Sequence, residues 1–323
     1  MKKIAVLIID ELVDLTTVTG VKEIFSRTND FLVSTGKNKA FEVKLVGLQT
    51  DNALDKNLSL RTDTVISEYK YPNLIIIPSS TDPLSLATPS PEVVHWLYSA
   101  YSNGSEIATL CTGSLLLAST GLLNGRTCST HWAMANEFQS RFPKVNLVSE
   151  KVITDDGRIY TSGGAYSFLN LIVYLIEKYG GRQASIWAAK MFGIDMGRDS
   201  QSQFIIFQGQ KQHQDNEILR VQEFIETNCH QKIVIGQLAT MVNIDNRNFI
   251  RRFKRATYNT PLEYVQKVKM EVAKRKLETT NMSIGEIKYS LAWSDDNTFR
   301  KVFKRHTNMT PSEYKSKYSV LHA

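Results

Sequence analysis

The chain has 323 residues, of which 42% are hydrophobic and 22% charged, a composition that excludes disorder throughout. Because domains typically hold roughly 100–200 residues, this length predicts two of them. The net charge of +7 is located near the C-terminus: residues 211–323 hold 20 Lys and Arg against 12 Asp and Glu, whereas residues 1–210 hold 19 against 20. A basic third of this kind can follow a phosphate backbone, although a solvated basic face gives the same count.

The longest apolar runs, residues 4–9 and 74–78, are far shorter than the roughly 20 residues that span a bilayer, so they predict buried strands and no membrane association. Asp10 and Glu11 interrupt the first run before the apolar core of a signal peptide could form. We therefore expect a cytoplasmic protein. The three cysteines, Cys111, Cys128 and Cys229, show no Cys-x-x-Cys spacing. We therefore expect reduced thiols, with neither a disulfide framework nor a metal site. No other cofactor is expected.

The first 195 residues alternate short apolar runs with amphipathic segments. The predicted strands are Ile4–Ile9, Phe41–Gly47, Leu74–Ile77 and Ile107–Leu110, and the predicted helices are Thr16–Arg27, Glu92–Ser102 and Ser114–Ser119. Such alternation is typical of βαβ units. Residues 1–200 are therefore expected to form a flavodoxin-like α/β domain, with a mostly parallel sheet covered by helices on both faces.

A cysteine lies where one predicted strand gives way to a helix, in Leu110-Cys111-Thr112-Gly113-Ser114. A sharp strand-to-helix turn presents its central side chain at the carboxyl end of the sheet, where open α/β sheets bind ligands. The helix N-terminus there is expected to lower the pKa of the Cys111 thiol. His131 and the strand-end turn at Tyr160–Gly164 are further candidates for the same pocket. A buried, inert cysteine is the alternative interpretation, and sequence alone does not show that Cys111 touches His131.

These stretches resemble the class I glutamine-amidotransferase-like superfamily, in its PfpI-like branch. The resemblance rests on residues 111–113, 121–126, 130–132 and 160–162. It implies a nucleophilic cysteine assisted by a histidine or by an acid near the first strand, and Asp14, Cys111 and His131 match those positions. The chain departs from the pattern at Ala133, where amidotransferases have an acid, and at Pro78-Ser79-Ser80, where many relatives have Gly-Gly.

These departures favour a sensing pocket without catalytic residues. Its expected lining residues are Asp14, Ser79, Cys111, Thr112, His131 and Ser162.

Glutamine becomes frequent between Gln201 and Gln214, which predicts a linker over residues 201–215. From Glu217 onward apolar residues recur at helical spacing, so residues 216–323 are expected to form an all-α domain.

An internal repeat organises this last domain. Phe249-x-x-x-Phe253-Lys254-Arg255 recurs fifty positions later as Phe299-x-x-x-Phe303-Lys304-Arg305, and Thr260-Pro261-Leu262-Glu263-Tyr264 recurs as Thr310-Pro311-Ser312-Glu313-Tyr314. In each Thr-Pro-x-Glu stretch Thr can cap a helix, Pro suits its first turn and Glu can close a capping box. A new helix is therefore expected directly after each basic helix.

Each basic helix follows a shorter apolar one, Ile235–Val242 in the first copy and Ile284–Leu291 in the second. Helix, short turn and basic helix form the helix-turn-helix layout, whose second helix enters the major groove of DNA. The recognition helices are predicted at about residues 245–256 and 295–306. The candidate DNA-binding residues are Asn246, Arg247, Asn248, Arg251, Lys254, Arg255, Asp296, Asn297, Arg300, Lys301, Lys304 and Arg305.

Within that set, Arg247, Arg251, Asn297 and Arg300 are the candidates for contacts to base edges, because arginine and asparagine can make bidentate bonds there. The cations nearer the helix ends are expected to hold phosphates. A solvated basic face is the alternative for either helix, and the repetition in register favours DNA binding over it.

Residues 216–318 closely resemble the AraC/XylS DNA-binding domain, to which PfpI-like domains are found fused. The match is carried by Ala292-Trp293-Ser294-Asp295, Phe299–Arg305 and Thr310–Tyr314, with Ala292 in place of a turn glycine and Trp293 in place of phenylalanine. The resemblance implies two recognition helices joined by a rigid helix, here Leu262–Leu277, and placed in successive major grooves on one face of the DNA.

Three hypotheses follow. The favoured one is a ligand-responsive transcription regulator that binds promoter DNA and a small metabolite, such as an amino-acid derivative or a quaternary amine. It is expected to dimerise with itself and to act with RNA polymerase. The second is a cysteine hydrolase or hydratase with a DNA-binding appendage, and the third is an architectural DNA protein without a ligand. The two helix-turn-helix units in register are more specific than the cysteine turn, so no enzyme activity is expected.

Overall fold

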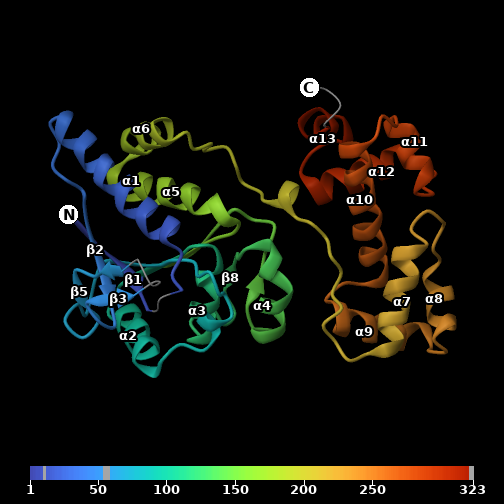
Figure 1. The fold of residues 1–323 in the computed structure, drawn as a ribbon, viewed down its shortest axis with the longest axis horizontal. Helices are drawn as coiled ribbons and strands as arrows, with labels where there is room; N and C mark the ends of the chain where they lie inside the picture. Colours follow the sequence, from blue (N-terminus) through green and yellow to red (C-terminus); the bar gives the residue numbers. More distant parts are fainter. Residues whose placement is uncertain (10–11, 54–58, 320–323) are drawn as a thin grey trace. The chain divides into compact units, whose positions relative to one another are not determined.

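The computed structural model describes residues 1–9, 12–53 and 59–319 of the chain. Two compact units make up the chain, Met1–Gln201 and Ser202–Ala323 (Figure 1). Within the described residues no helix is both long and apolar enough to cross a membrane.

The first unit is built on a seven-stranded sheet with the strand order β10-β11-β7-β6-β1-β2-β5. Its neighbouring strands run parallel except for the antiparallel pair β10–β11. The strands of this sheet are β1 (Lys2–Ile8), β2 (Phe41–Gly47), β5 (Thr64–Val65), β6 (Leu74–Ile77), β7 (Glu106–Thr109), β10 (Ile153–Asp156) and β11 (Ile159–Ser162). Two small sheets pair β3 (Asp51–Ala53) with β4 (Ser59–Arg61) and β8 (Thr127–Cys128) with β9 (Asn146–Leu147).

Helices cover both faces of the large sheet (Figure 1). They are α1 (Leu15–Ser34), α2 (Pro91–Ser102), α3 (Ser114–Ser119), α4 (Ala135–Arg141), α5 (Phe168–Gly180) and α6 (Arg182–Phe192). The alternation of side chains along β1 divides the core in two: Ile4, Val6 and Ile8 pack with α1, α5 and α6, whereas Ala5 and Leu7 pack with α2 and α3. The predicted α/β fold is confirmed.

The predicted elements of this unit lie where expected, but the prediction was incomplete. The helix predicted over Thr16–Arg27 continues to Ser34, where Thr35 ends it. The β10–β11 hairpin and helices α5 and α6 were not predicted as elements. Strand β10 holds a single apolar residue, Ile153, so no apolar run marks it as one marks β6.

The second unit is helical. Its helices are α7 (Asn216–Thr227), α8 (Ile235–Met241), α9 (Asn246–Thr257), α10 (Pro261–Thr279), α11 (Ile284–Ser290), α12 (Asp296–Thr307) and α13 (Pro311–Tyr318). They surround two separate hydrophobic cores, one for each copy of the repeat. The long helix α10 contributes Tyr264, Val265 and Val268 to the first core and Met270, Ala273 and Leu277 to the second.

Capping fixes the starts of the helices in both copies. Thr260 and Thr310 each accept a hydrogen bond from the backbone amide three residues on, and Glu263 and Glu313 close the capping boxes. Ser283 caps α11 in the same way. Because these bonds favour the ionised carboxylate, they lower the pKa of Glu263.

The glutamine-rich segment makes hydrogen bonds to the helices that follow it. Its residues 202–214, here called the strap, are hydrogen-bonded to the second unit: the Ile205 carbonyl accepts from Lys274 Nζ at 2.6 Å, and the Phe207 amide donates to Glu271 Oε2 at 3.1 Å. The Gln210 carbonyl accepts from Gln222 Nε2 at 2.8 Å. Composition predicted a linker over residues 201–215, and these side chains satisfy backbone groups of the segment and hold it in place.

Candidate functional site

Two helix pairs of the second unit have the geometry of helix-turn-helix units. In the first, α8 is followed by a tight turn in which Asn243 adopts a left-handed φ of +53°, and Asp245 then caps α9. In the second, α11 is followed by Ala292 at a φ of +51°, and Asp295 caps α12. Alanine at the position of the expected turn glycine thus keeps the left-handed conformation, and the turn is preserved.

Both recognition helices bury aromatic side chains on one side. Phe249 and Phe253 of α9 are completely buried, as is Phe303 of α12, and Phe299 is 1% exposed. Each helix makes the same edge-on contact, Phe253 with Tyr264 and Phe303 with Tyr314. These contacts fix which side of each helix faces outward.

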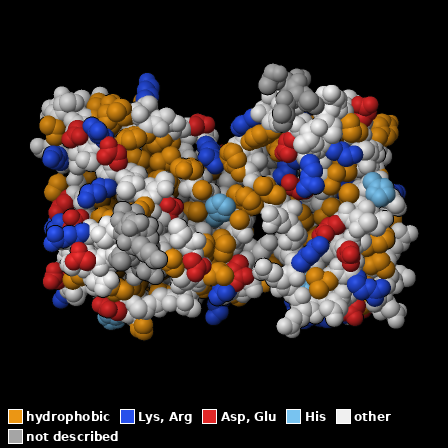
Figure 2. Space-filling model, viewed as in Figure 1, with side chains coloured by type: hydrophobic (Ala, Val, Ile, Leu, Met, Phe, Trp, Pro, Cys, Tyr) orange, Lys and Arg blue, Asp and Glu red, His pale blue; other side chains and the backbone are white. Residues whose placement is uncertain are grey.

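The predicted DNA-binding side chains lie on the outward sides. Among them Asn248 is half-buried, and the exposed residues are Asn246, Arg247, Arg251, Lys254, Arg255, Asp296, Asn297, Arg300, Lys301, Lys304 and Arg305. On the face of this unit seen in Figure 2, Lys and Arg side chains are interspersed with Asp and Glu. Exposure is what DNA binding requires, and the role of each side chain stays a prediction.

Among the described residues, four of these side chains already have partners in the chain. Arg251 Nη2 donates to Asn248 Oδ1 at 3.1 Å, which orients the guanidinium along α9. Arg305 Nη2 donates to Gln266 Oε1 of α10 at 2.6 Å. Asp296 pairs with Lys288 of α11 at 2.6 Å, so its carboxylate joins the two helices of the second helix-turn-helix unit.

Arg252 was absent from the predicted set, and the structure explains its different role. Its Nε and Nη2 donate to Asp215 at 2.5 and 2.8 Å, and Nη2 also donates to Glu217 at 2.6 Å. These bonds dock α9 against the start of α7. Burial by itself would raise the pKa of Asp215. The hydrogen bonds and the positive charge of Arg252 outweigh burial, so the pKa of Asp215 is lowered.

The predicted turn in the first unit is present at Cys111. The residue has a φ of +54°, and its amide donates to Ser162 Oγ at 3.3 Å. Position 113 requires glycine, because a Cβ at Gly113 would lie 2.5 Å from the Pro78 carbonyl oxygen. The structure therefore brings Cys111 and Ser162 together at the carboxyl end of the sheet.

Asp14, Ser79 and Thr112 connect the loops at the same end of the sheet. The Asp14 carboxylate accepts from the Thr16 amide and from Ser79 Oγ, both at 2.9 Å. Thr112 Oγ1 accepts from the Ser80 amide at 3.2 Å. Within the described residues no Lys, Arg or His forms a salt bridge with Asp14.

The expected lowering of the thiol pKa is wrong. Cys111 is 5% exposed, and burial, with a contribution from the negative charge of Asp14, raises its pKa to about 12. His131 Nδ1 accepts from the Ala133 amide at 3.1 Å, and burial lowers the pKa of this histidine. Among the described residues no hydrogen bond joins His131 to Cys111.

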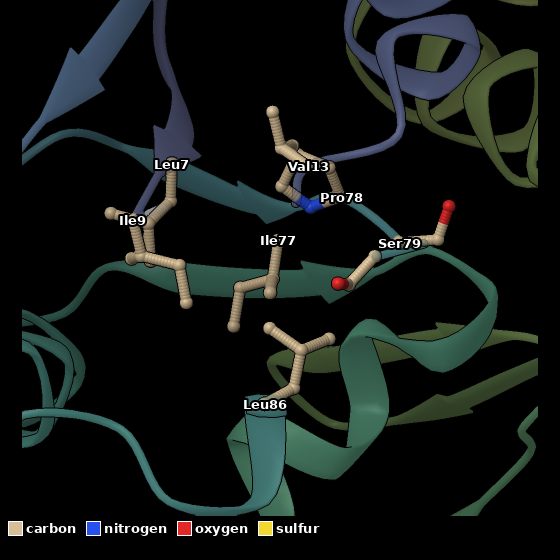
Figure 3. Close-up of a pocket in the computed structure, with 8 residues that line it drawn as sticks. Leu7, Ile9, Val13, Ile77, Pro78, Ser79 and Leu86 are labelled. Atoms are coloured by element: carbon tan, nitrogen blue, oxygen red, sulfur yellow. The ribbon is translucent and has the colours of Figure 1, made fainter. Parts of the chain in front are cut away.

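A small hollow opens beside these loops (Figure 3). It is lined by Leu7, Ile9, Val13, Ile77, Pro78, Ser79, Ser80 and Leu86. Of the predicted pocket residues, only Ser79 lines it, and it has room for about one water molecule. Asp10 and Glu11, which follow Ile9, lie outside the described residues.

Sequence reasoning missed two kinds of residue at this end of the sheet. Ser114 and Thr130 join their hydroxyls at 2.8 Å and support the Cys111 carbonyl. Gln201, which was expected in the linker, places its amide against the Thr130 carbonyl at 3.0 Å. Ser114 and Thr130 lie in stretches that the sequence singled out, but they were not named as pocket residues. Gln201 is part of no recognisable motif, and glutamine-rich composition concealed it.

Comparison with known proteins identifies both units. The sequence profile of the DJ-1/PfpI family matches residues 2–178, more than half of the chain. The chain belongs to the DJ-1/PfpI family. A second profile, described as a helix-turn-helix domain, matches residues 238–317. The predicted combination of a PfpI-like domain with an AraC-type helix-turn-helix domain is thus confirmed.

Curated proteins named as HTH-type transcriptional regulators are similar to this chain. The HTH-type transcriptional regulator GbdR of Pseudomonas aeruginosa strain UCBPP-PA14 is 28% identical over 226 residues, which cover 69% of this chain and 60% of GbdR. CdhR of Pseudomonas aeruginosa strain PAO1, also named an HTH-type transcriptional regulator, is 23% identical over 79% of this chain and 76% of its own length.

Solved structures agree on the fold of the DJ-1/PfpI unit. An AraC family transcriptional regulator from Pseudomonas putida is similar over 59% of this chain and 100% of its own, at 17% identity and a TM-score of 0.50. A ThiJ/PfpI family protein from Pseudomonas syringae is similar over 60% of this chain and 75% of its own, at 17% identity and a TM-score of 0.51.

Proposed function

We propose that this DJ-1/PfpI protein is a ligand-responsive transcription regulator. The second unit binds promoter DNA through α9 and α12, and the first unit binds a small metabolite that controls this binding. The observation that carries the proposal is the repetition of one geometry: two helix-turn-helix units in register bury phenylalanines on one side and expose cations on the other. The relatives named as transcriptional regulators support it.

On DNA the exposed side chains divide by their chemistry. Arg247 and Arg251 of α9, with Asn297 and Arg300 of α12, are assigned to base edges, because they lie in the first half of each helix. The cations of the last turns, Lys254 and Arg255 of α9 and Lys304 and Arg305 of α12, are assigned to phosphates.

A pair of alanine substitutions tests this division. Arg251→Ala should remove a base contact worth roughly 1–3 kcal/mol and relax the preference at one base pair. Lys304→Ala should weaken all sequences alike and reduce the salt dependence of binding by about one phosphate contact. Both are measured by selecting duplexes from a random library and titrating the winners by fluorescence anisotropy.

Lys190→Ala, an exposed cation of the first unit, is the control and should change neither property. If Arg251→Ala left affinity and sequence preference as in the wild type, α9 would not be a recognition helix. Failure of the library to yield any enriched duplex would contradict the proposed function as a whole.

The chemistry beside the hollow favours a cationic metabolite. The Asp14 carboxylate accepts hydrogen bonds from two neutral donors, the Thr16 amide and the Ser79 hydroxyl. The hollow beside it is lined mainly by aliphatic side chains. A quaternary amine or an amino-acid derivative, with a cationic head and apolar groups, suits such surroundings. Because the hollow is small, binding requires the loop at Ser79 and Ser80 to move outward.

A thermal-shift screen of the full chain tests the sensing role. Quaternary amines such as glycine betaine and amino acids such as L-arginine are the first compounds to use. A ligand at 100 times its dissociation constant should stabilise the first unit by about 2.7 kcal/mol. Asp14→Asn, which keeps the shape but removes the charge, should abolish the shift. A shift that survives this substitution would place the ligand elsewhere.

The alternative, a cysteine hydrolase or hydratase, needs a thiolate and a base beside it. Burial keeps the Cys111 thiol protonated, and His131 is occupied with the Ala133 amide, so the arrangement supports a sensor. We further propose that the protein acts in the cytoplasm as a homodimer together with RNA polymerase; these three features stay predictions.

A further inference from the structure

Gln201 is the last residue of the first unit and is completely buried. Its side-chain Nε2 donates to the carbonyl oxygens of Thr130 at 3.0 Å and Ser149 at 2.5 Å. Its backbone amide donates to the Glu150 carbonyl at 2.8 Å. A polar side chain fully enclosed in this way holds the end of the unit to its interior.

The neighbouring strand leaves room for this amide. A Cβ at Gly163, directly after β11, would lie only 2.0 Å from Gln201 Nε2 and 2.7 Å from the Thr130 carbonyl oxygen. Glycine at this position is therefore required for Gln201 to occupy its slot. The slot is one residue from Ser162, whose hydroxyl accepts from the Cys111 amide.

A chain of hydrogen bonds joins the slot to the turn at Cys111. Thr130, whose carbonyl accepts from Gln201, donates its hydroxyl to the Cys111 carbonyl at 3.4 Å and accepts from Ser114 Oγ at 2.8 Å. Gln201 Oε1 has no hydrogen-bond partner among the described residues. The amide is thus fixed on its donor side alone, and a shift of Thr130 can move it.

The strap begins immediately after Gln201 and is fixed to the second unit within four residues. Gln203 Oε1 accepts from Lys317 Nζ at 2.8 Å and from the Tyr318 hydroxyl at 3.3 Å. The Ile205 carbonyl accepts from Lys274 Nζ at 2.6 Å, and the 3-10 turn Ser202–Phe204 packs against α12. Ser202 is the one residue between Gln201, which is bonded within the first unit, and Gln203, which is bonded within the second.

We infer that Gln201 is a coupling residue, which passes a change at the Cys111 turn through the strap to the second recognition helix, α12. A flexible linker would absorb a displacement of Gln201, whereas a chain anchored on both sides of Ser202 transmits it. The inference rests on the proposed function, since it states how a metabolite bound in the first unit would change DNA binding. It adds that the second helix-turn-helix unit is the one controlled.

Hydrogen exchange of the full chain tests the coupling without the metabolite. Gln201→Met keeps the length of the side chain and removes the amide. We expect exchange of the α12 amides to rise by about fivefold or more, while the amides of β1 remain as protected as in the wild type. Gln208→Met, the same change at an exposed glutamine of the strap, is the control and should leave α12 unaltered.

Unchanged α12 exchange in Gln201→Met, with increased exchange only around Thr130 and Gly163, would overturn the coupling and leave Gln201 a local structural residue. If β1 loses its protection, the first unit has unfolded and Gln201→Asn, which retains the amide on a shorter side chain, replaces the variant under the same criterion. Loss of the coupling would not contradict DNA or metabolite binding, because the duplex selection and the thermal-shift screen test those separately.

Discussion

Cys111 is subject to two opposing electrostatic effects. It lies ahead of the N-terminus of α3, where the helix dipole favours a thiolate. It is also buried, and Asp14 adds a negative charge nearby, both of which favour the neutral thiol. Dipole stabilisation is typically worth less than about 1 kcal/mol at such a terminus, whereas full burial can shift a pKa by several units. Burial therefore determines the state of this thiol.

A conservative substitution separates a sensor from a nucleophile. Cys111→Ser changes little in volume and should keep metabolite binding within about tenfold of the wild type, because the thiol is already uncharged. In a nucleophile the same change would lower turnover by orders of magnitude. We expect chromatography to recover the bound metabolite unchanged after hours with wild-type protein, and Cys111→Ser to respond in a reporter strain.

Cys229→Ser, the same substitution at a partly exposed cysteine of the second unit, is the matched control and should behave as wild type. Conversion of the metabolite by the wild type, lost together with the reporter response in Cys111→Ser, would make catalysis part of the signal.

Among the elements, those with a strong pattern could be predicted and those held by tertiary contacts could not. The helices of the repeat were located to within one or two residues because Thr-Pro-x-Glu capping and paired phenylalanines mark their ends. The order of the strap was not predicted because it comes from Lys274, Glu271 and Gln222, which lie far along the chain. The turn at Cys111 was predicted, but its burial, which decides its chemistry, depends on loops at Ser79 and Thr130.

Helix α10 carries one buried ammonium group that joins both copies of the repeat. Lys269 is 6% exposed, and its Nζ donates to the Gln231 carbonyl ahead of α8 at 2.9 Å and to the Leu291 carbonyl at the end of α11 at 2.8 Å. Burial lowers the pKa of Lys269. The side chain therefore ties the segment before α8 and the C-terminal end of α11 to the helix between the two units.

Replacing Lys269 by methionine should show this role. Lys269→Met keeps the aliphatic stem but leaves the two carbonyl groups without this donor, so we expect the second unit to lose about 1–3 kcal/mol of stability. Urea unfolding followed by circular dichroism of the helical unit measures the loss. Arg275→Met, at an exposed position of the same helix, is the control. Equal stability of the two variants would show that the bonds of Lys269 contribute nothing.

At the scale of the whole molecule, the basic residues and the hydrophobic cores are both divided between the two units. The basic excess belongs to residues 211–323, and the helical unit that contains them has two cores of its own. Composition and repetition were enough to predict this division and the class of each part. The coupling between the parts could not be predicted, since Gln201 carries no motif and is recognised only by its burial.

The distribution of the three cysteines also makes the native protein suitable for site-specific labelling. Cys111 and Cys128 are buried and Cys229 is partly exposed, and burial raises the pKa of both buried thiols to about 12. A maleimide dye should therefore attach to Cys229 without prior removal of other cysteines. Cys229 is two residues from Gln231, whose carbonyl accepts from Lys269 Nζ, so a dye there would report on the junction of the two helix-turn-helix units.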